Sequence, residues 1–275
     1  MKTLKELAED AAATVDSGFY RKIPSMKPLD RRSLVQSILK RSRPAIICEI
    51  KFASPSAGEI DDRHDQVSQI ANEMETGGAA GLSVLTEPKS FAGSLENLAA
   101  ARMSTNLPVI MKDIIVSKDQ IEAAQKIGAS SVLLIWELFA SGYSKNNLSL
   151  EDAIAAAKSR ELEVVVEAHS REGLNETARL ACEIIGIKNR DLKTFKTNID
   201  TTVDLLKEVS LPGRLLMSES GFENASDISY VIEKLNHAGA SIPRAFLIGT
   251  SIMRTRDVRN KVAELAGIHL KRVVS

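Results

Sequence analysis

The sequence predicts an α/β fold, specifically a (β/α)8 TIM barrel with an N-terminal helical extension. Short apolar segments alternate with amphipathic helical segments from residue 45 onward, and this alternation indicates a parallel sheet with right-handed crossovers. Eight such units of roughly thirty residues each match the size of a TIM barrel. A doubly wound open sheet is the alternative, but no G-x-G-x-x-G motif follows the first predicted strand.

The first 44 residues precede the first strand and predict two helices. Thr3 and Glu6 form a capping-box pattern at the start of the first helix, and Gly18 ends its apolar periodicity. A second, shorter helix is expected to start near Asp30. Because a segment of this length cannot bury a core of its own, we divide the chain into a helical extension packed on the barrel, residues 1–44, and a barrel catalytic domain, residues 45–275.

Each predicted strand is a short apolar run, and each predicted helix has apolar residues three and four positions apart. The strands are expected at residues 45–51, 81–85, 109–112, 131–136, 164–167, 184–187, 215–219 and 245–248. The helices are expected at residues 66–76, 95–103, 118–127, 150–160, 171–180, 201–209, 227–236 and 258–266. Gly77 and Gly128 are predicted C-terminal caps, and Ser149 and Asp200 are predicted N-terminal caps.

The composition argues against several kinds of partner. The chain has 36 Lys and Arg against 36 Asp and Glu, and a net charge of zero gives no support to a nucleic-acid or membrane partner. We see no export signal and no apolar run near the ~20 residues that span a bilayer. Cys48 and Cys182 lie in apolar contexts and are expected to be reduced thiols. We expect a cytoplasmic protein, either a monomer or a weak homo-oligomer.

Charged residues stand at the carboxyl ends of five predicted strands. Glu49 and Lys51 are two residues apart, so both side chains leave the first strand on the same face. Other strands end near Lys112, Glu167, Lys188, Arg190 and Glu219. A TIM barrel brings these ends to one mouth, where Lys112 and Glu167 could act as an acid–base pair. The alternatives are a structural ion pair on the first strand and ordinary solvated charges on the others.

The loops after the last two strands have the composition of a phosphate site. Ser220-Gly221 and Gly249-Thr250-Ser251 are short and combine small side chains with hydroxyls. Loops in this position, followed by a helix N-terminus, bind phosphate in many barrels. The alternative is that the glycines only allow tight turns. The four histidines are scattered and show no metal-ligand spacing, so a metal site is not expected.

Several motifs occur together in an order that is specific to one family. They are EIKFASPSAG (49–58), LSVLTEP (82–88), FAGSL (91–95), MKD (111–113), GIKNRDL (186–192), ESG (219–221) and FLIGTS (246–251). On these motifs the chain resembles the indole-3-glycerol phosphate synthases of tryptophan biosynthesis. The resemblance covers the barrel almost from end to end, and the helical extension fits it as well.

The resemblance implies ring closure of 1-(2-carboxyphenylamino)-1-deoxyribulose 5-phosphate to indole-3-glycerol phosphate. The aromatic ring attacks the sugar ketone, carbon dioxide leaves, and water leaves last. By resemblance, Lys112 is the general acid at the ketone oxygen and Glu167 is the base for later proton removal. Lys51 contacts the substrate carboxylate and could serve as the acid in dehydration. Glu49 and Glu219 hold the lysines and the sugar hydroxyls in place.

The resemblance also implies a set of substrate-binding residues. Contacts to phosphate or neighbouring hydroxyls are expected from Ser54, Ser220, Gly221, Gly249 and Thr250. Arg190 is expected near the substrate carboxylate, and an aromatic slot is expected from Pro55, Phe91 and Leu133. No cofactor is needed, because the decarboxylation restores aromaticity.

The chain departs from the family pattern at four positions. Lys188 stands where the family usually has Asn. It is expected to bind substrate, or it could instead pair with Glu167 and lower the pKa of that base. Ile114 stands where an aromatic residue is common, so the ring slot is expected to be looser. Phe52 and Ala57 replace residues that are often basic, which is expected to weaken contacts of the entry loop to an anion.

Two other functions fit parts of the pattern. One is another phosphosugar barrel enzyme such as phosphoribosylanthranilate isomerase, which would need a Cys/Asp pair at strand ends. Cys48 precedes Glu49 and is expected to point away from the mouth, which argues against this reading. The other is a barrel with weakened catalysis that only binds a phosphorylated ligand or a partner, and Lys188 is the feature that favours it.

Overall fold

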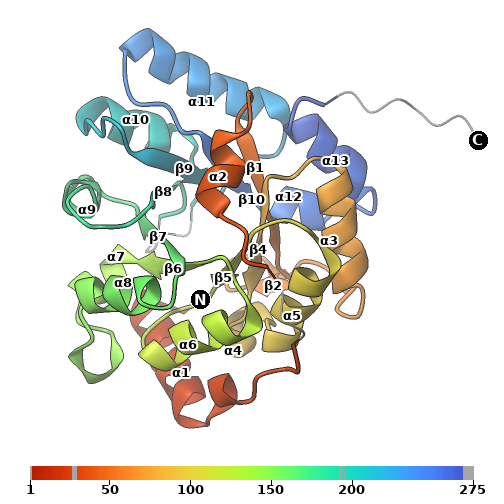
Figure 1. Ribbon diagram of the computed structural model, residues 1–275. Helices are drawn as coiled ribbons and strands as arrows, with labels where there is room; N and C mark the ends of the chain where they lie inside the picture. The colour runs from red at the N-terminus through yellow and green to blue at the C-terminus, as the bar shows by residue number, and fades with distance from the viewer. Residues whose placement is uncertain (1, 27–29, 192–193, 195, 269–275) are drawn as a thin grey trace, which may run out of the picture.

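The computed structural model describes residues 2–26, 30–191, 194 and 196–268. Eight parallel strands close into a barrel in the order β1-β10-β9-β8-β7-β6-β5-β4, with helices packed around it (Figure 1). The strands are β1 (Ala45–Ile50), β4 (Gly81–Leu85), β5 (Val109–Lys112), β6 (Ser131–Ile135), β7 (Glu163–Ala168), β8 (Ile184–Lys188), β9 (Leu215–Glu219) and β10 (Ala245–Ile248). The barrel prediction is therefore confirmed.

The barrel strands are buried along nearly their whole length, as in other parallel sheets covered by helices. Their register decides which residues meet at the mouth. Glu167 on β7 lies opposite Gly186 on β8, and Lys188 at the end of β8 lies opposite Glu219 at the end of β9. The charged ends of three consecutive strands are thereby placed side by side.

The longer helices lie where apolar periodicity predicts them. They are α3 (Val67–Thr76), α5 (Leu95–Ser104), α6 (Lys118–Ile127), α8 (Leu150–Lys158), α9 (Arg171–Thr177), α10 (Asp200–Glu208), α11 (Ala225–Ala238) and α13 (Val258–Leu265). Gly77 and Gly128 cap helix ends and Ser149 caps α8, as predicted. Asp200 was predicted as an N-cap and is instead the first residue of α10. Its backbone N–H is bound by the side chain of Asn198.

Several short elements were not predicted from apolar periodicity, because each is only about one helical turn or a two-residue strand. They are α4 (Pro88–Phe91), α7 (Trp136–Ala140), α12 (Thr250–Met253), the 3₁₀ turns η1 (Phe19–Arg21) and η2 (Lys145–Asn147), and the hairpin β2 (Ala53–Ser54)–β3 (Gly58–Glu59). Trp136 was predicted to end the fourth strand and instead begins α7. Leu192 of the GIKNRDL motif lies outside the described residues.

The N-terminal segment contacts both ends of the barrel. Helix α1 (Leu4–Asp16) begins with the predicted capping box at Thr3. Helix α2 (Leu34–Leu39) starts after Ser33, later than the predicted start, because the Ser33 hydroxyl accepts a hydrogen bond from the N–H of Gln36. The Glu163 carboxylate, at the start of β7, accepts from the N–H of Leu34. Helix α2 therefore sits at the amino ends of the strands, and α1 lies toward the other end, next to the mouth.

Both cysteines are buried and neither forms a disulfide. Among the described residues, no helix has the length and apolarity needed to span a membrane.

Candidate active site

The first pair of charges lies at the end of β1. Lys51 Nζ donates to Glu49 Oε1 at 2.6 Å, and both side chains are almost completely buried. Their common face follows from the two-residue period of a strand, as the sequence predicted. β1 ends at Ile50, and the β2–β3 hairpin then folds beside the mouth.

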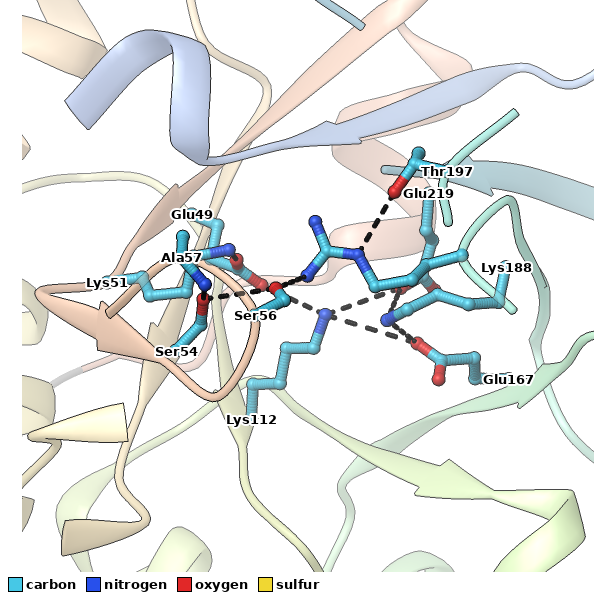
Figure 2. A network of polar contacts seen from close by, with 11 residues as sticks. Glu49, Lys51, Ser54, Ser56, Ala57, Lys112, Glu167, Lys188, Thr197 and Glu219 are labelled. Atoms are coloured by element: carbon cyan, nitrogen blue, oxygen red, sulfur yellow. Dashed lines mark hydrogen bonds and ion pairs between the residues drawn. The ribbon is translucent and has the colours of Figure 1, made fainter. Parts of the chain in front are cut away.

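Lys112, at the end of β5, lies at the centre of the charges. Its Nζ is 2.9 Å from Glu49 Oε2, 3.4 Å from Glu219 Oε2 and 4.0 Å from Glu167 Oε2. Figure 2 shows Lys112 reaching from its strand into a space between carboxylates that come from three other strands. The closed barrel therefore brings β1, β5, β7 and β9 together at one point, although the residues are far apart in the sequence.

Lys188 adds a third ammonium group to this cluster. Its Nζ donates to Glu167 Oε2 at 2.7 Å and lies 3.8 Å from Glu219 Oε2 (Figure 2). The predicted pairing of Lys188 with Glu167 is thus confirmed. Burial by itself would raise the pKa of Glu167, but the charges of Lys188 and Lys112 outweigh it and lower the pKa.

The two lysines that contact Glu49, Lys51 and Lys112, have opposite pKa shifts. Burial lowers the pKa of both, because it penalises the ammonium form. At Lys112 the carboxylates of Glu49, Glu219 and Glu167 outweigh burial, and the pKa is raised. At Lys51 the single carboxylate of Glu49 does not outweigh burial, and the pKa is lowered. Lys112 is therefore held firmly as an ammonium ion, whereas Lys51 gives up its proton more readily.

One cavity at the mouth is mainly apolar. Its apolar lining includes all three residues predicted for the aromatic slot, Pro55, Phe91 and Leu133, and also Ile114. Its charged lining includes Lys112, Glu167 and Lys188. Leu4 and Leu7 of α1 add to its apolar lining. A flat apolar group could therefore lie against the apolar lining with its edge next to the charged cluster.

A second cavity of about 260 Å³ opens beside the first and is lined by polar and small residues. Ser220, Gly221, Gly249 and Thr250 all line it, together with Arg254. Gly221 has φ +91°, and a Cβ there would lie 2.8 Å from Thr197 Cγ2. A Cβ on Gly249 would lie 2.7 Å from Glu49 Oε1. These glycines do more than permit turns, because a side chain at either position would crowd the site.

The two cavities adjoin each other and share five lining residues, which are Glu49, Lys51, Ser56, Arg190 and Ser220. Arg190 sits between them, where its Nη1 donates to Ser56 Oγ at 2.7 Å and its Nε donates to Thr197 Oγ1 at 3.1 Å. Ser54 faces the first cavity and caps the hairpin turn, accepting a hydrogen bond from the N–H of Ala57.

Every predicted site residue except Glu219 lines one of the two cavities. Glu219 is completely buried behind the charged cluster and touches it through Lys112 and Lys188. Sequence reasoning missed Leu4, Leu7 and Arg254. The two leucines belong to the apolar stripe of α1, which looks like any core-facing stripe, and Arg254 follows a one-turn helix that has no periodic signal.

Comparison with known proteins identifies the family. The family model described as Indole-3-glycerol phosphate synthase matches residues 3–265. The indole-3-glycerol phosphate synthases of two Staphylococcus aureus strains, bovine RF122 / ET3-1 and JH1, are each 34% identical to this chain over 269 residues, which is 96% of this chain and 97% of theirs.

The chain belongs to the indole-3-glycerol phosphate synthase family.

Indole-3-glycerol phosphate synthase is a carboxy-lyase of tryptophan biosynthesis that acts on a phosphorylated small molecule, and this is the activity of the chain. The three chemical groups of its substrate, an aromatic carboxylate, a ketone and a phosphate, match the mixture of apolar, cationic and small polar surfaces at the mouth.

Solved structures with low sequence identity share the fold. Thiamine phosphate pyrophosphorylase from Pyrococcus furiosus has a TM-score of 0.57 at 14% identity and covers 83% of this chain and 96% of its own. N-acetylmannosamine-6-phosphate 2-epimerase from Clostridium perfringens has a TM-score of 0.61 at 11% identity, with 84% and 95% covered. Within the part of the chain that the structure describes, no group of three or more His, Cys, Asp and Glu side chains could hold a metal ion.

Proposed function

We propose that Lys112 is the general acid of indole-3-glycerol phosphate synthesis in this chain. The observation that supports this role is the position of its ammonium group, within 4.0 Å of the buried carboxylates of Glu49, Glu167 and Glu219. These carboxylates keep Lys112 charged and fix its ammonium group where negative charge develops on the ketone oxygen, although they also make it a weaker acid than a free lysine. A fixed ammonium group beside a mainly apolar cavity stabilises such charge far better than water does.

Glu167 and Lys51 are proposed for the later proton transfers. Glu167 faces the apolar cavity as a carboxylate and would remove the proton that leaves carbon during dehydration. Lys51 would protonate the departing hydroxyl, and its lowered pKa supports this role because it makes the ammonium a better acid. Glu49 would hold both Lys51 and Lys112 in place, and Glu219 would support Lys112 from behind.

The two cavities suggest how the substrate is oriented. The phosphate would occupy the cavity lined by Ser220, Gly221, Gly249 and Thr250, and the aromatic ring would lie in the cavity lined by Pro55, Phe91 and Leu133. Arg190 and Lys51, which line both cavities, would meet the substrate carboxylate, with Ser54 and Lys188 nearby. This placement would bring the ring carbon and the ketone together next to Lys112, which is the main requirement for ring closure.

We also propose that residues 1–44 form an extension of one catalytic domain, since Leu4 and Leu7 complete the wall of the apolar cavity. A reducing compartment such as the cytoplasm would suit the two buried thiols. A monomer or a weak homo-oligomer would suffice for the reaction, because each charged group of the cluster comes from this one chain.

The activity can be tested directly with purified protein. We expect it to convert the carboxyphenylamino sugar phosphate to a fluorescent indole product in the presence of a metal chelator. Tight substrate binding without any product would contradict the proposed roles and would favour the binding-only alternative, for which the close pairing of Lys188 with Glu167 provides a physical reason.

A further inference from the structure

The charged cluster contains three lysines and three glutamates, but its ion pairs are unevenly distributed. The shortest contact of each lysine goes to Glu49 or Glu167. Lys51 and Lys112 lie 2.6 and 2.9 Å from Glu49, and Lys188 lies 2.7 Å from Glu167. Glu219 receives only longer contacts, 3.4 Å from Lys112 and 3.8 Å from Lys188. Glu219 is thus the carboxyl group with the weakest cationic support.

Glu219 is also the least exposed of the three, with no accessible surface. Its Oε1 accepts no hydrogen bond from any donor in the described part of the chain, and both lysine contacts go to Oε2. The backbone of Gly186 packs so closely against Oε1 that a Cβ there would overlap it. An ionised carboxylate with one bare buried oxygen is costly, whereas a protonated carboxyl group avoids most of that cost.

The charged groups that face Glu219 come from several elements. They are Lys112 on β5, Glu167 on β7, Lys188 on β8 and, beyond Lys112, Glu49 on β1. Strand β10, on its other side, carries only apolar residues. Oε2 of Glu219 and Oε2 of Glu167 each lie within 4.0 Å of both Lys112 and Lys188, so the two carboxyl groups compete for the same two cations, and a proton on one of them relieves the repulsion between them.

We infer that Glu219 holds a proton at neutral pH in the resting enzyme and passes it to Lys112 during turnover. Lys188 favours the charged form of Glu167, because its ammonium lies 2.7 Å from Glu167 and 3.8 Å from Glu219. Lys112 has the opposite but smaller preference, since it lies 3.4 Å from Glu219 and 4.0 Å from Glu167. Glu219 is then a store of one proton for Lys112. This inference depends on the proposal above that Lys112 is the general acid.

The chemistry of the reaction gives such a store a use. The ketone oxygen takes up one proton on ring closure, the departing hydroxyl takes up a second, and one proton is released from carbon, so each turnover consumes one proton. When an N–H bond of Lys112 breaks to protonate the ketone oxygen, its amine lone pair takes the proton from Glu219. The new carboxylate is then paired with the restored ammonium. The proton that Glu167 removes from carbon returns to the pair of carboxyl groups, and solvent supplies the one consumed.

The electrostatics agree with this assignment. Burial raises the pKa of Glu219, the charge of Glu167 raises it further, and Lys112 and Lys188 only partly oppose these effects. The same two lysines outweigh burial at Glu167. The two buried carboxyl groups therefore titrate in opposite directions from their usual range, as expected for neighbours that share one proton.

Infrared difference spectroscopy of the ligand-free enzyme during a pH titration tests the inference. A protonated carboxyl group has a carbonyl stretch that a carboxylate lacks. Asp113, a second buried acid, would also contribute, so D113N serves as the background. We expect the acid band to be present at neutral pH, to disappear on titration to alkaline pH, and to be absent when Glu219→Gln is added.

A second variant keeps the inference testable even when Glu219→Gln folds poorly. Lys188→Asn removes a cation from both carboxyl groups, so the alkaline midpoint of the band should rise by about one pH unit or more. No band that depends on Glu219, or an unchanged midpoint in Lys188→Asn, would overturn the inference. Because the spectra are recorded without substrate, this failure is distinguishable from a failure of Lys112 as the acid, which turnover measurements report.

Discussion

Lys112 and Asp113 are adjacent in the chain but belong to two different buried polar regions. Lys112 faces the mouth, among three carboxylates. The Asp113 carboxyl group instead accepts hydrogen bonds from the hydroxyls of Tyr20 and Thr86 and from the side-chain amide of Gln120. Each region contains a carboxyl group that is almost completely buried, Glu49 in the first and Asp113 in the second.

The two carboxyl groups differ in the charge of their partners. Burial raises the pKa of Asp113 to about 7, because the neutral donors Thr86 and Tyr20 only partly offset the cost of burying a charge. Burial acts on Glu49 in the same sense, but Lys112 and Lys51 outweigh it and hold the pKa far below its usual range. At equal burial, therefore, the charge of the partner decides the protonation state.

The difference in charge indicates different roles for the two regions, catalysis for the first and structural stability for the second. The mouth holds fixed charges of both signs, as proton transfer requires, whereas the Asp113 region ties η1 of the N-terminal segment to the end of β5 through Tyr20. We expect changes in the charged cluster to act mainly on turnover and changes around Asp113 to act mainly on stability.

The largest effect is expected for Lys112→Ala, which removes the central charge of the mouth. Turnover should fall by about 10²- to 10⁴-fold, the usual contribution of a general acid, with little effect on folding. The measurement is product fluorescence together with thermal unfolding. Lys126→Ala serves as a control, because Lys126 forms an exposed pair with Glu122 on α6. Near-normal turnover in Lys112→Ala would exclude Lys112 as the acid.

Gly186→Ala should disturb the mouth without changing any charge. The new methyl group would overlap Glu219 Oε1 and displace that carboxyl group from Lys112. A displacement of this kind can lower turnover by up to about a hundredfold. Gly142→Ala is the control, since a Cβ at Gly142 meets no atom within 4 Å and its positive φ affects only backbone strain. Equal turnover in both variants would contradict the proposed position of Glu219.

Lys188→Asn should make the surroundings of Glu167 more like those of Asp113, which has only neutral hydrogen-bond donors. Loss of the ammonium 2.7 Å from Glu167 raises the pKa of that base. The acid limb of the kcat/KM profile should therefore move to higher pH, because Glu167 must be deprotonated to act. Turnover at alkaline pH should rise, because a stronger base removes the proton faster. An unchanged profile would mean that Lys188 does not control Glu167.

The smallest effect is expected for Asp113→Asn and concerns stability. Asp113 has a raised pKa in the folded state, so between about pH 4 and pH 7 the folded protein binds more protons than the unfolded chain. The free energy of unfolding should fall through this window as pH rises, by at most about 1.4 kcal/mol per pH unit from this group.

In Asp113→Asn this contribution should be absent, and denaturant unfolding at several pH values measures it. Glu49 and Glu167 contribute with the opposite sign, since their lowered pKa values add stability that is lost as the pH falls. Only the difference between the two proteins therefore isolates Asp113. The same pH slope in both proteins would show that Asp113 is ionised throughout.

Much of this architecture can be predicted from local patterns. Alternating apolar runs and amphipathic helices predict the barrel, and the two-residue period of a strand predicts that Glu49 and Lys51 share a face. Predictions failed at the ends of elements, where contacts within a single turn decide where a strand or helix begins or ends. Trp136 starts a short helix rather than ending a strand, and Asp200 lies inside α10 because Asn198 binds its N–H.

The sequence by itself determined the barrel, the strand ends that carry charge and the family, because these depend on residue order and on periods of two to four residues. Only the tertiary structure decided which lysine pairs with which carboxylate, that Glu219 lies behind the mouth, and that Leu4 and Leu7 help to enclose it. Closure of the ring sets those distances through the register of eight strands, and no local period contains that information.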